Sequence, residues 1–157
     1  MSKRPETGEM APDFTAAVVG GEYDGEAAVT LSELRGENVV LYFYPKDNTP
    51  GCTTQACALR DGWSEISAKA KVFGVSVDSI RKHENFIAKH ELPFPLISDE
   101  DKAVVEAYGV WVEKKMAGRT YMGIERTTFV IGPDGVLKAV FPKVKPDQHL
   151  EMVLEVL

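Results

Sequence analysis

The segment from Val39 to Tyr44 constrains the fold of this chain more than any other stretch of its sequence. It reads Val-Val-Leu-Tyr-Phe-Tyr, an unbroken run of β-branched, aliphatic and aromatic residues that Pro45 ends. A run with no polar residue at alternate positions is typical of a strand that is buried on both faces. Since such a strand needs cover on each side, the segment predicts an α/β fold.

The remaining hydrophobic patterns alternate between strand and helix. The expected strands cover residues 13–17, 39–44, 72–77, 127–131 and 136–141, and residues 20–25 read as a turn region. The expected helices cover residues 53–66, 80–90, 102–107 and 146–157. Gly132-Pro133-Asp134-Gly135 has turn chemistry and predicts a hairpin between the last two strands. This order predicts a mixed central sheet flanked by helices, which matches a thioredoxin-like fold with an N-terminal strand extension.

Length and cysteine content bound the size and setting of the protein. A chain of 157 residues fits a single domain over residues 1–157, and such a chain buries roughly two-thirds of its unfolded surface without disulfides. Two cysteines are too few for a secreted disulfide scaffold. The polar start predicts no signal peptide, and no run approaches the roughly 20 apolar residues that span a bilayer. We therefore expect a cytoplasmic protein with no membrane partner.

The charge balance argues against nucleic-acid binding. The formal net charge is −6, and no cluster of lysine and arginine exceeds two adjacent residues. A phosphate-binding surface would need a basic stripe. We therefore expect an ordinary solvated acidic surface and no nucleic-acid partner.

Cys52 lies where the first buried strand gives way to a helix, beyond the carboxyl end of that strand, which is where open α/β sheets build their sites. The unpaired N–H groups and the positive dipole end at a helix start favour an anion, and hence a thiolate. Thr49, three residues earlier, has a hydroxyl that can donate and accept hydrogen bonds, while Pro45 and Pro50 restrict the loop. Position alone leaves two possibilities, a reactive thiolate and an inert apolar cysteine.

Cys57 follows Cys52 by five residues. Five residues of α-helix separate the two Cα atoms by roughly 8–9 Å, whereas a disulfide requires about 4.4–6.8 Å. An intact helix therefore cannot contain this bond, and forming it requires the first turns to unwind. The spacing suggests a folded dithiol and a locally unfolded disulfide, and a nearby second thiol protects a redox cysteine from over-oxidation.

The segment Thr49-Pro50-Gly51-Cys52-Thr53, with Pro45 before it and Cys57 after it, resembles the active-site segment of the peroxiredoxins. It is most similar to their Q type, the bacterioferritin comigratory protein subfamily. The resemblance extends to three further segments, which are Ala11-Pro12-Asp13-Phe14, Gly109-Val110-Trp111 and residues 121–129. These matches run in order from near residue 10 to the terminal helix, and Asn48 and Val112 are small departures from the pattern.

The resemblance implies an atypical two-cysteine thiol peroxidase that reduces hydrogen peroxide and organic hydroperoxides without a metal or organic cofactor. Cys52 matches the peroxidatic cysteine, Thr49 the residue that hydrogen-bonds the peroxide, and Pro45 the proline that shields the sulfur. Arg126 matches the arginine beside the thiolate. Cys57 matches the resolving cysteine, which closes an intramolecular disulfide that thioredoxin or a similar dithiol reductant opens. A monomer or weak dimer is expected.

Arg126 has a simpler explanation if the resemblance is set aside. Its guanidinium is permanently charged and has five donors, so it can stabilise a thiolate and a departing oxygen. The same group could instead form a surface ion pair with Glu125. The resemblance favours the functional role.

Two other functions for the cysteine pair remain open at this level. A non-enzymatic redox sensor or binding module on the same fold would use the disulfide to switch a partner surface. A general disulfide oxidoreductase is disfavoured because four residues, not two, separate the cysteines.

The histidines predict no metal site. His83, His90 and His149 have no carboxylate three or four residues away, where a helix would present one. Their spacing from the cysteines does not fit a zinc finger. Tyr44 and Trp111 are expected to pack in the core, although either could border the pocket.

Overall fold

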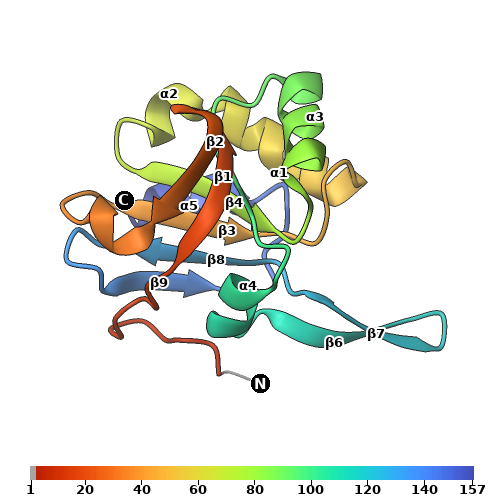
Figure 1. Cartoon of the computed structure of the whole chain (residues 1–157). Coiled ribbons are helices and arrows are strands. Elements are labelled where there is room, and N and C mark those ends of the chain that lie inside the picture. The colour runs from red at the N-terminus through yellow and green to blue at the C-terminus, as the bar shows by residue number, and fades with distance from the viewer. Residues whose placement is uncertain (1–2) are drawn as a thin grey trace.

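Strand β3 (Val39–Phe43) occupies the interior of a seven-stranded mixed sheet, and all five of its residues are buried (Figure 1). The computed structural model describes residues 3–157, apart from the side chains of residues 25 and 26. The strand order is β2-β1-β5-β4-β3-β8-β9. The other six strands are β1 (Thr15–Gly20), β2 (Tyr23–Thr30), β4 (Lys71–Ser76), β5 (Leu96–Ser98), β8 (Thr127–Ile131) and β9 (Leu137–Phe141).

The pairing within the sheet changes direction across its width. Strands β3, β4 and β5 are parallel neighbours, which is the arrangement that buried apolar strands predict. The outer pairs β1–β2, β1–β5, β3–β8 and β8–β9 are antiparallel. A separate two-stranded hairpin, β6 (Trp111–Met116) and β7 (Arg119–Ile124), extends away from the body (Figure 1).

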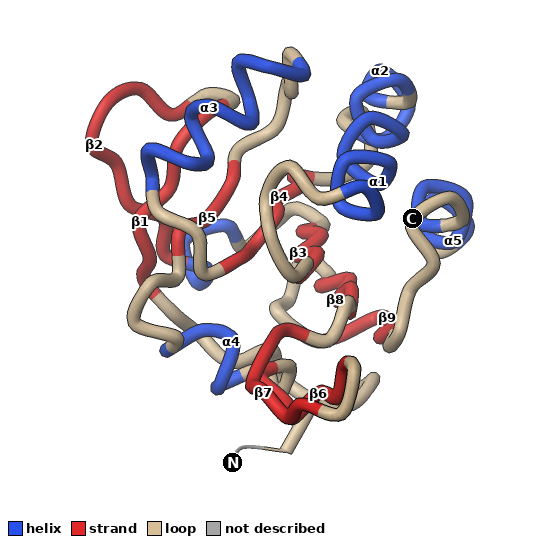
Figure 2. Tube along the Cα trace, turned by 90° about the vertical axis from the view of Figure 1, so that its right-hand side faces the viewer, coloured by secondary structure: helices blue, strands red, loops and turns tan. Residues whose placement is uncertain are grey.

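Alternate residues of β3 face two different hydrophobic clusters. Val40 and Tyr42 pack with residues of α1 (Pro50–Asp61), α2 (Trp63–Ile66), α3 (Ile80–His90) and α5 (His149–Glu155). Val39, Leu41 and Phe43 pack on the other face with residues of the 3-10 helix η1 (Leu31–Leu34) and α4 (Ala103–Ala107). Figure 2 shows α4 and the hairpin on the opposite side of the sheet from α1 and α5. The predicted mixed sheet with flanking helices is confirmed.

Helix α1 is fixed at its C-terminal end by α5. Gly62 caps α1, and its N–H donates to the Ala58 carbonyl at 3.0 Å. A Cβ at Gly62 would lie 2.5 Å from Leu150 Cδ2, so the two helices approach closely because residue 62 has no side chain. The last turn of α1 therefore rests directly on the C-terminal helix.

Several predicted boundaries agree with the structure and others are corrected. Helix α3, the β8–β9 hairpin and the central strand are confirmed. The first helix begins at Pro50 rather than residue 53, because proline is favoured in a first turn, and Gly62 divides it from α2. The first strand is shifted to Thr15–Gly20, and β2 begins at Tyr23, inside the segment expected to be a turn region. Strands β2, β5, β6 and β7 were not predicted.

Helices α4 and α5 are also shorter than the predicted segments, at Ala103–Ala107 and His149–Glu155. On α3, Phe86 is fully buried, and Ile87 is partly buried and packs against the same cluster as Phe86. Among residues 3–157, no helix has both the length and the apolar content that crossing a membrane requires.

His149 ties α5 to the sheet. Its side chain is fully buried, and its Nε2 is hydrogen-bonded to the Thr128 hydroxyl of β8 at 2.8 Å. Burial, with a smaller contribution from the charge of Arg126, lowers the pKa of His149 to about 3. The folded protein therefore holds this imidazole neutral at pH values where an exposed histidine is protonated.

This lowered pKa predicts a loss of stability in weak acid. As the pH falls below the ordinary histidine pKa of about 6.5, His149 becomes protonated in the unfolded chain. In the folded protein the same side chain stays unprotonated until about pH 3. The free energy of unfolding should fall by about 2 kcal/mol between pH 7 and pH 5 from this residue alone. Urea unfolding at several pH values should show a shallower decline for His149→Gln. An identical pH dependence in both proteins would contradict this account.

Candidate active site

Cys52 lies in the first turn of α1, directly after the loop that leaves β3. Pro50 occupies the start of the helix and Thr49 is the N-cap residue, which makes no side-chain capping bond. Cys52 is only 2% exposed and packs in the cluster under α1. The first-turn N–H groups have no intrahelical partners, so this position favours a negative charge at the thiol.

The guanidinium of Arg126 lies over the same first turn. Arg126 immediately precedes β8, and its Nη1 donates to Gln55 Oε1 at 2.7 Å. Its Nη2 is 3.1 Å from the point where a Cβ would lie on Gly51, the neighbour of Cys52. Because residue 51 is glycine, the charged group can approach the helix backbone. A fixed cation thus adds to the positive end of α1.

The alternative ion pair for Arg126 does not form. Glu125 instead accepts a hydrogen bond from Arg4 Nη1 at 3.3 Å, while Arg126 binds Gln55. The guanidinium of Arg126 is therefore available to the pocket rather than neutralised by its neighbour in sequence.

Two further side chains interact electrostatically with Cys52 and Arg126. Burial, followed by the charge of Arg126, lowers the pKa of Lys114 on β6, whereas the charge of Cys52 acts in the opposite direction. Burial, followed by the charges of Asp47 and Cys52, raises the pKa of Tyr42 well above its usual value. The surroundings of Cys52 therefore combine two cationic side chains with a phenol that stays protonated.

The loop between β3 and α1 holds the other predicted site residues. Pro45 and Thr49 are half-buried, and the Thr49 hydroxyl donates to the Lys46 carbonyl at 2.8 Å. The Thr49 carbonyl accepts from the Thr53 N–H at 2.9 Å, which joins the loop to α1. Asn48 has a φ of 60°, in the left-handed region that asparagine tolerates better than most residues.

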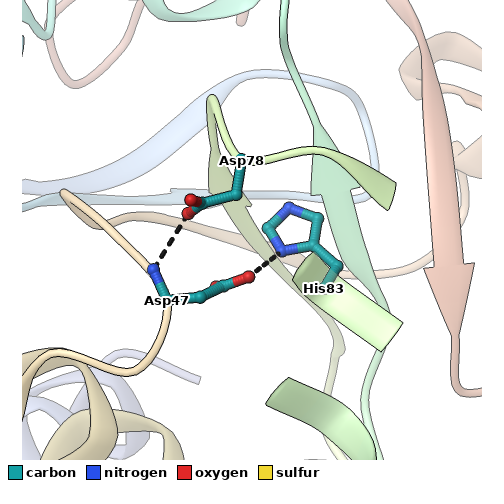
Figure 3. A group of neighbouring side chains, drawn as sticks. All are labelled: Asp47, Asp78 and His83. Carbon is teal, nitrogen blue, oxygen red and sulfur yellow. Dashed lines mark hydrogen bonds and ion pairs between the residues drawn. The ribbon is translucent and has the colours of Figure 1, made fainter. Parts of the chain in front are cut away.

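Behind this loop, Asp47, Asp78 and His83 form a buried group (Figure 3). His83 Nδ1 is 2.6 Å from Asp47 Oδ2, and Asp78 Oδ2 accepts from the Asp47 N–H at 2.9 Å. His83 was expected to have no carboxylate three or four residues away on its own helix, and α3 has none at those positions. Its partner instead lies 36 positions away in sequence, which helical spacing cannot reveal.

The same three side chains have atoms of the kind that bind metals, all within 4.8 Å of one another. Those atoms already bind groups within the protein. The histidine bonds Asp47 and the Ile97 carbonyl, and Asp78 Oδ2 also accepts from the Ser76 hydroxyl at 2.6 Å. We therefore describe the group as a hydrogen-bonded network and assign no metal to it.

Cys57 lies two-thirds of the way along α1 and is half-buried. Its Sγ is 3.9 Å from His90 Nδ1 at the end of α3. Both cysteines are free thiols and the helix between them is intact. The structure is therefore the dithiol form that the spacing predicts for a continuous helix.

A buried thiol at a helix start, with an arginine over it and a second thiol in the same helix, invites comparison with known families. The model of the AhpC/TSA family matches residues 7–140. The chain belongs to the AhpC/TSA family. It is a peroxiredoxin of the Bcp type, a peroxidase of the oxidoreductase class, as the resemblance implied.

Curated relatives and solved structures agree on this placement. A putative peroxiredoxin bcp of Coxiella burnetii is 50% identical over 150 residues, which cover 95% of this chain and 96% of the relative. Peroxiredoxin Bcp of Bacillus subtilis is 45% identical over 153 residues, covering 97% and 94%. The structure is similar to a PrxQ variant of Xylella fastidiosa, with a TM-score of 0.87 and 35% identity over 99% of this chain and 96% of that one.

A further similar structure is the bacterioferritin comigratory protein of Xanthomonas campestris, described for its alkyl peroxide reduction activity. The TM-score is 0.82 and the identity 39%, over 90% of this chain and 88% of that one. These neighbours also confirm the thioredoxin-like fold class.

Sequence reasoning missed two parts of the site of this peroxiredoxin. Gln55 is fully buried and anchors Arg126, yet a glutamine inside a helix gives no local signal of that role. Lys114 lies on a strand that was not predicted. Trp111 packs against the core beside α4, and Tyr44 is a buried donor to Asp47 rather than a pocket wall.

The position of Arg126 predicts a change in thiol reactivity. Arg126→Ala removes the cation over the first turn, so Cys52 should form its thiolate at higher pH and react more slowly with peroxide. Iodoacetamide alkylation of Cys52 against pH, followed by mass spectrometry, measures the first effect. Arg81→Ala, which removes an exposed arginine from α3, is the control and should leave alkylation unchanged. Equal alkylation profiles for wild type and Arg126→Ala would contradict the electrostatic role.

Proposed function

We propose that this peroxiredoxin reduces hydrogen peroxide and small organic hydroperoxides with electrons from a dithiol protein such as thioredoxin. The observation that carries the proposal is the buried Cys52 in the first turn of α1, with the Arg126 guanidinium over that turn. The alkyl peroxide reduction described for the Xanthomonas campestris neighbour supports organic hydroperoxides as substrates.

In the first step, the Cys52 thiolate attacks the terminal oxygen of the hydroperoxide. The S–O bond forms and the O–O bond breaks, so Cys52 becomes a sulfenic acid and the leaving oxygen takes a proton to give water or an alcohol. That oxygen gains negative charge in the transition state, where the fixed donors of Arg126 stabilise it. The Thr49 hydroxyl orients the peroxide, and Pro45 shields the sulfur from bulk water.

In the second step, the Cys57 thiolate attacks the sulfur of the sulfenic acid. The S–S bond forms, the S–O bond breaks and the oxygen leaves as water. Because the intact helix separates the two Cα atoms by roughly 8–9 Å, α1 must unwind near Cys52 before the bond closes. The dithiol reductant then returns two electrons and two protons by thiol–disulfide exchange. None of these steps requires a metal or organic cofactor.

The same scheme suggests where and in what form the protein works. Recycling by a dithiol protein suits the reducing cytoplasm. The five proposed site residues belong to one chain and to one domain over residues 1–157, so a monomer or weak dimer is sufficient. These residues are Pro45, Thr49, Cys52, Cys57 and Arg126.

Cys52→Ser should abolish turnover, because it removes the attacking thiolate. The measurement is peroxide-dependent NADPH oxidation in the presence of thioredoxin and thioredoxin reductase. Wild type should consume many equivalents of peroxide, whereas a redox sensor would stop after one. Substantial peroxidase activity in the serine variant would contradict the proposal.

Cys57→Ser should separate the peroxide step from resolution. The variant retains Cys52, so it should reduce about one equivalent of peroxide at the wild-type rate and then stall or over-oxidise. Stopped-flow peroxide consumption measures the first phase, and mass spectrometry identifies sulfenic and sulfinic acids. Normal thioredoxin-supported cycling in this variant would show that Cys57 is not the resolving residue.

A further inference from the structure

The buried group behind the active-site loop restrains that loop at its middle residue. Asp47 Oδ1 accepts from the Tyr44 hydroxyl at 2.6 Å, and Asp47 Oδ2 bonds His83 Nδ1 at 2.6 Å. The Asp47 backbone N–H donates to Asp78 at 2.9 Å. One loop residue is thereby tied to the end of β3, the β4–α3 connection and α3, as Figure 3 shows for the contacts with Asp78 and His83.

The contacts of His83 determine its protonation. Its Nε2 lies 2.9 Å from the Ile97 carbonyl, which only accepts, so this nitrogen must carry a proton. Its Nδ1 faces a carboxylate oxygen that lies in the same group as the Tyr44 donor bond. A contact of 2.6 Å between an imidazole nitrogen and a carboxylate oxygen requires one proton between the two atoms. Whichever atom holds that proton, the His83–Asp47 pair as a whole carries no net charge.

The surroundings of the pair make this neutralisation necessary. His83 is 0% exposed, and Asp47 and Asp78 are each 6% exposed. Two buried carboxylates whose oxygens lie within 4.8 Å of one another would repel strongly if Asp47 had no partner to cancel its charge. Tyr44 is the other titratable group that faces Asp47, and burial raises the pKa of Tyr44 well above its usual value, so it donates a hydrogen bond and carries no charge.

We propose that His83 is a positioning residue for the peroxide step: through Asp47 it holds the loop that leads to Cys52, and it cancels the Asp47 charge behind that loop. The inference rests on the proposed role of Cys52. The loop contains Pro45 and Thr49, and Thr49 bonds the carbonyl of Lys46, the neighbour of Asp47. Without the bond to His83, Asp47 would no longer hold this loop in place. The left-handed backbone at Asn48 is a strained conformation, so the released loop should relax.

The electrostatic part of the role concerns the thiolate. Tyr44, which bonds Asp47, stacks on Tyr42 with ring centroids 5.4 Å apart, and Tyr42 packs in the same buried cluster as Cys52. Arg126, immediately before β8, and Lys114, on β6, are the cations that act on this cluster, and they favour the thiolate. An Asp47 carboxylate without its partner would oppose them, and Cys52 would form its thiolate only at higher pH.

The test compares wild type, His83→Gln and the double variant Asp47→Asn/His83→Gln, all in a Cys57→Ser background. Glutamine keeps a hydrogen-bond donor but cannot supply the proton that neutralises Asp47. In His83→Gln, the midpoint of iodoacetamide alkylation of Cys52 should rise by about one pH unit. The rate constant with hydrogen peroxide, measured where the thiolate is fully formed, should fall about 10- to 100-fold. In the double variant, which has no unpaired buried charge, the alkylation midpoint should return to the wild-type value.

A midpoint that does not move in folded His83→Gln, or that stays raised in the double variant, overturns the proposal. His149→Gln is the matched control, since it removes a buried but neutral histidine and should lower stability without moving the midpoint. The 1H spectrum of the wild-type protein tests the pair directly. The proton shared by His83 and Asp47 should give a strongly deshielded signal, and its absence from the folded protein overturns the inference even if the variants do not fold. Turnover by Cys52→Ser would instead show that the proposed function fails.

Discussion

Strand β3 is buried on both faces, so other elements of the chain must pack on each face of it. The site forms where one of these elements, α1, begins. The carboxyl end of β3 leads into a six-residue loop, and α1 starts where its first turn can pack back onto the sheet. The same packing that protects Tyr42 also buries Cys52. The thiol is thus removed from water while the unpaired N–H groups of the helix remain directed at it.

Buried charge is distributed unequally around this junction. Behind the loop, His83 neutralises the Asp47 carboxylate, and both of its ring nitrogens have hydrogen-bond partners. In front of it, Arg126 is anchored by an uncharged amide, Gln55, and keeps its full charge for the pocket. A carboxylate at position 55 would have held the guanidinium equally well but would have neutralised it. The neutral Gln55 therefore orients the Arg126 guanidinium without neutralising its charge.

The parts of the molecule that follow from local pattern could be predicted from the sequence. The buried strand, helix α3 and the β8–β9 turn are specified by residues that lie close together in the chain, as is Cys52 at a helix start. The β6–β7 hairpin could not be predicted in this way, because its strands are polar and largely exposed and so lack a core-facing alternation. The partnership of Asp47 with His83 depends on parallel pairing of β3 and β4, which brings distant residues together.

The close packing of Gly62 on Leu150 has a consequence for how sequences of this type can vary. A side chain at position 62 would overlap Leu150 Cδ2 at 2.5 Å, so enlargement at one position requires reduction at the other. These two positions should therefore change together among related chains, although they are 88 residues apart (150 minus 62) and neither lies in the pocket. The C-terminal helix restricts which residues can end α1, and through α1 it restricts the neighbourhood of the reactive thiol.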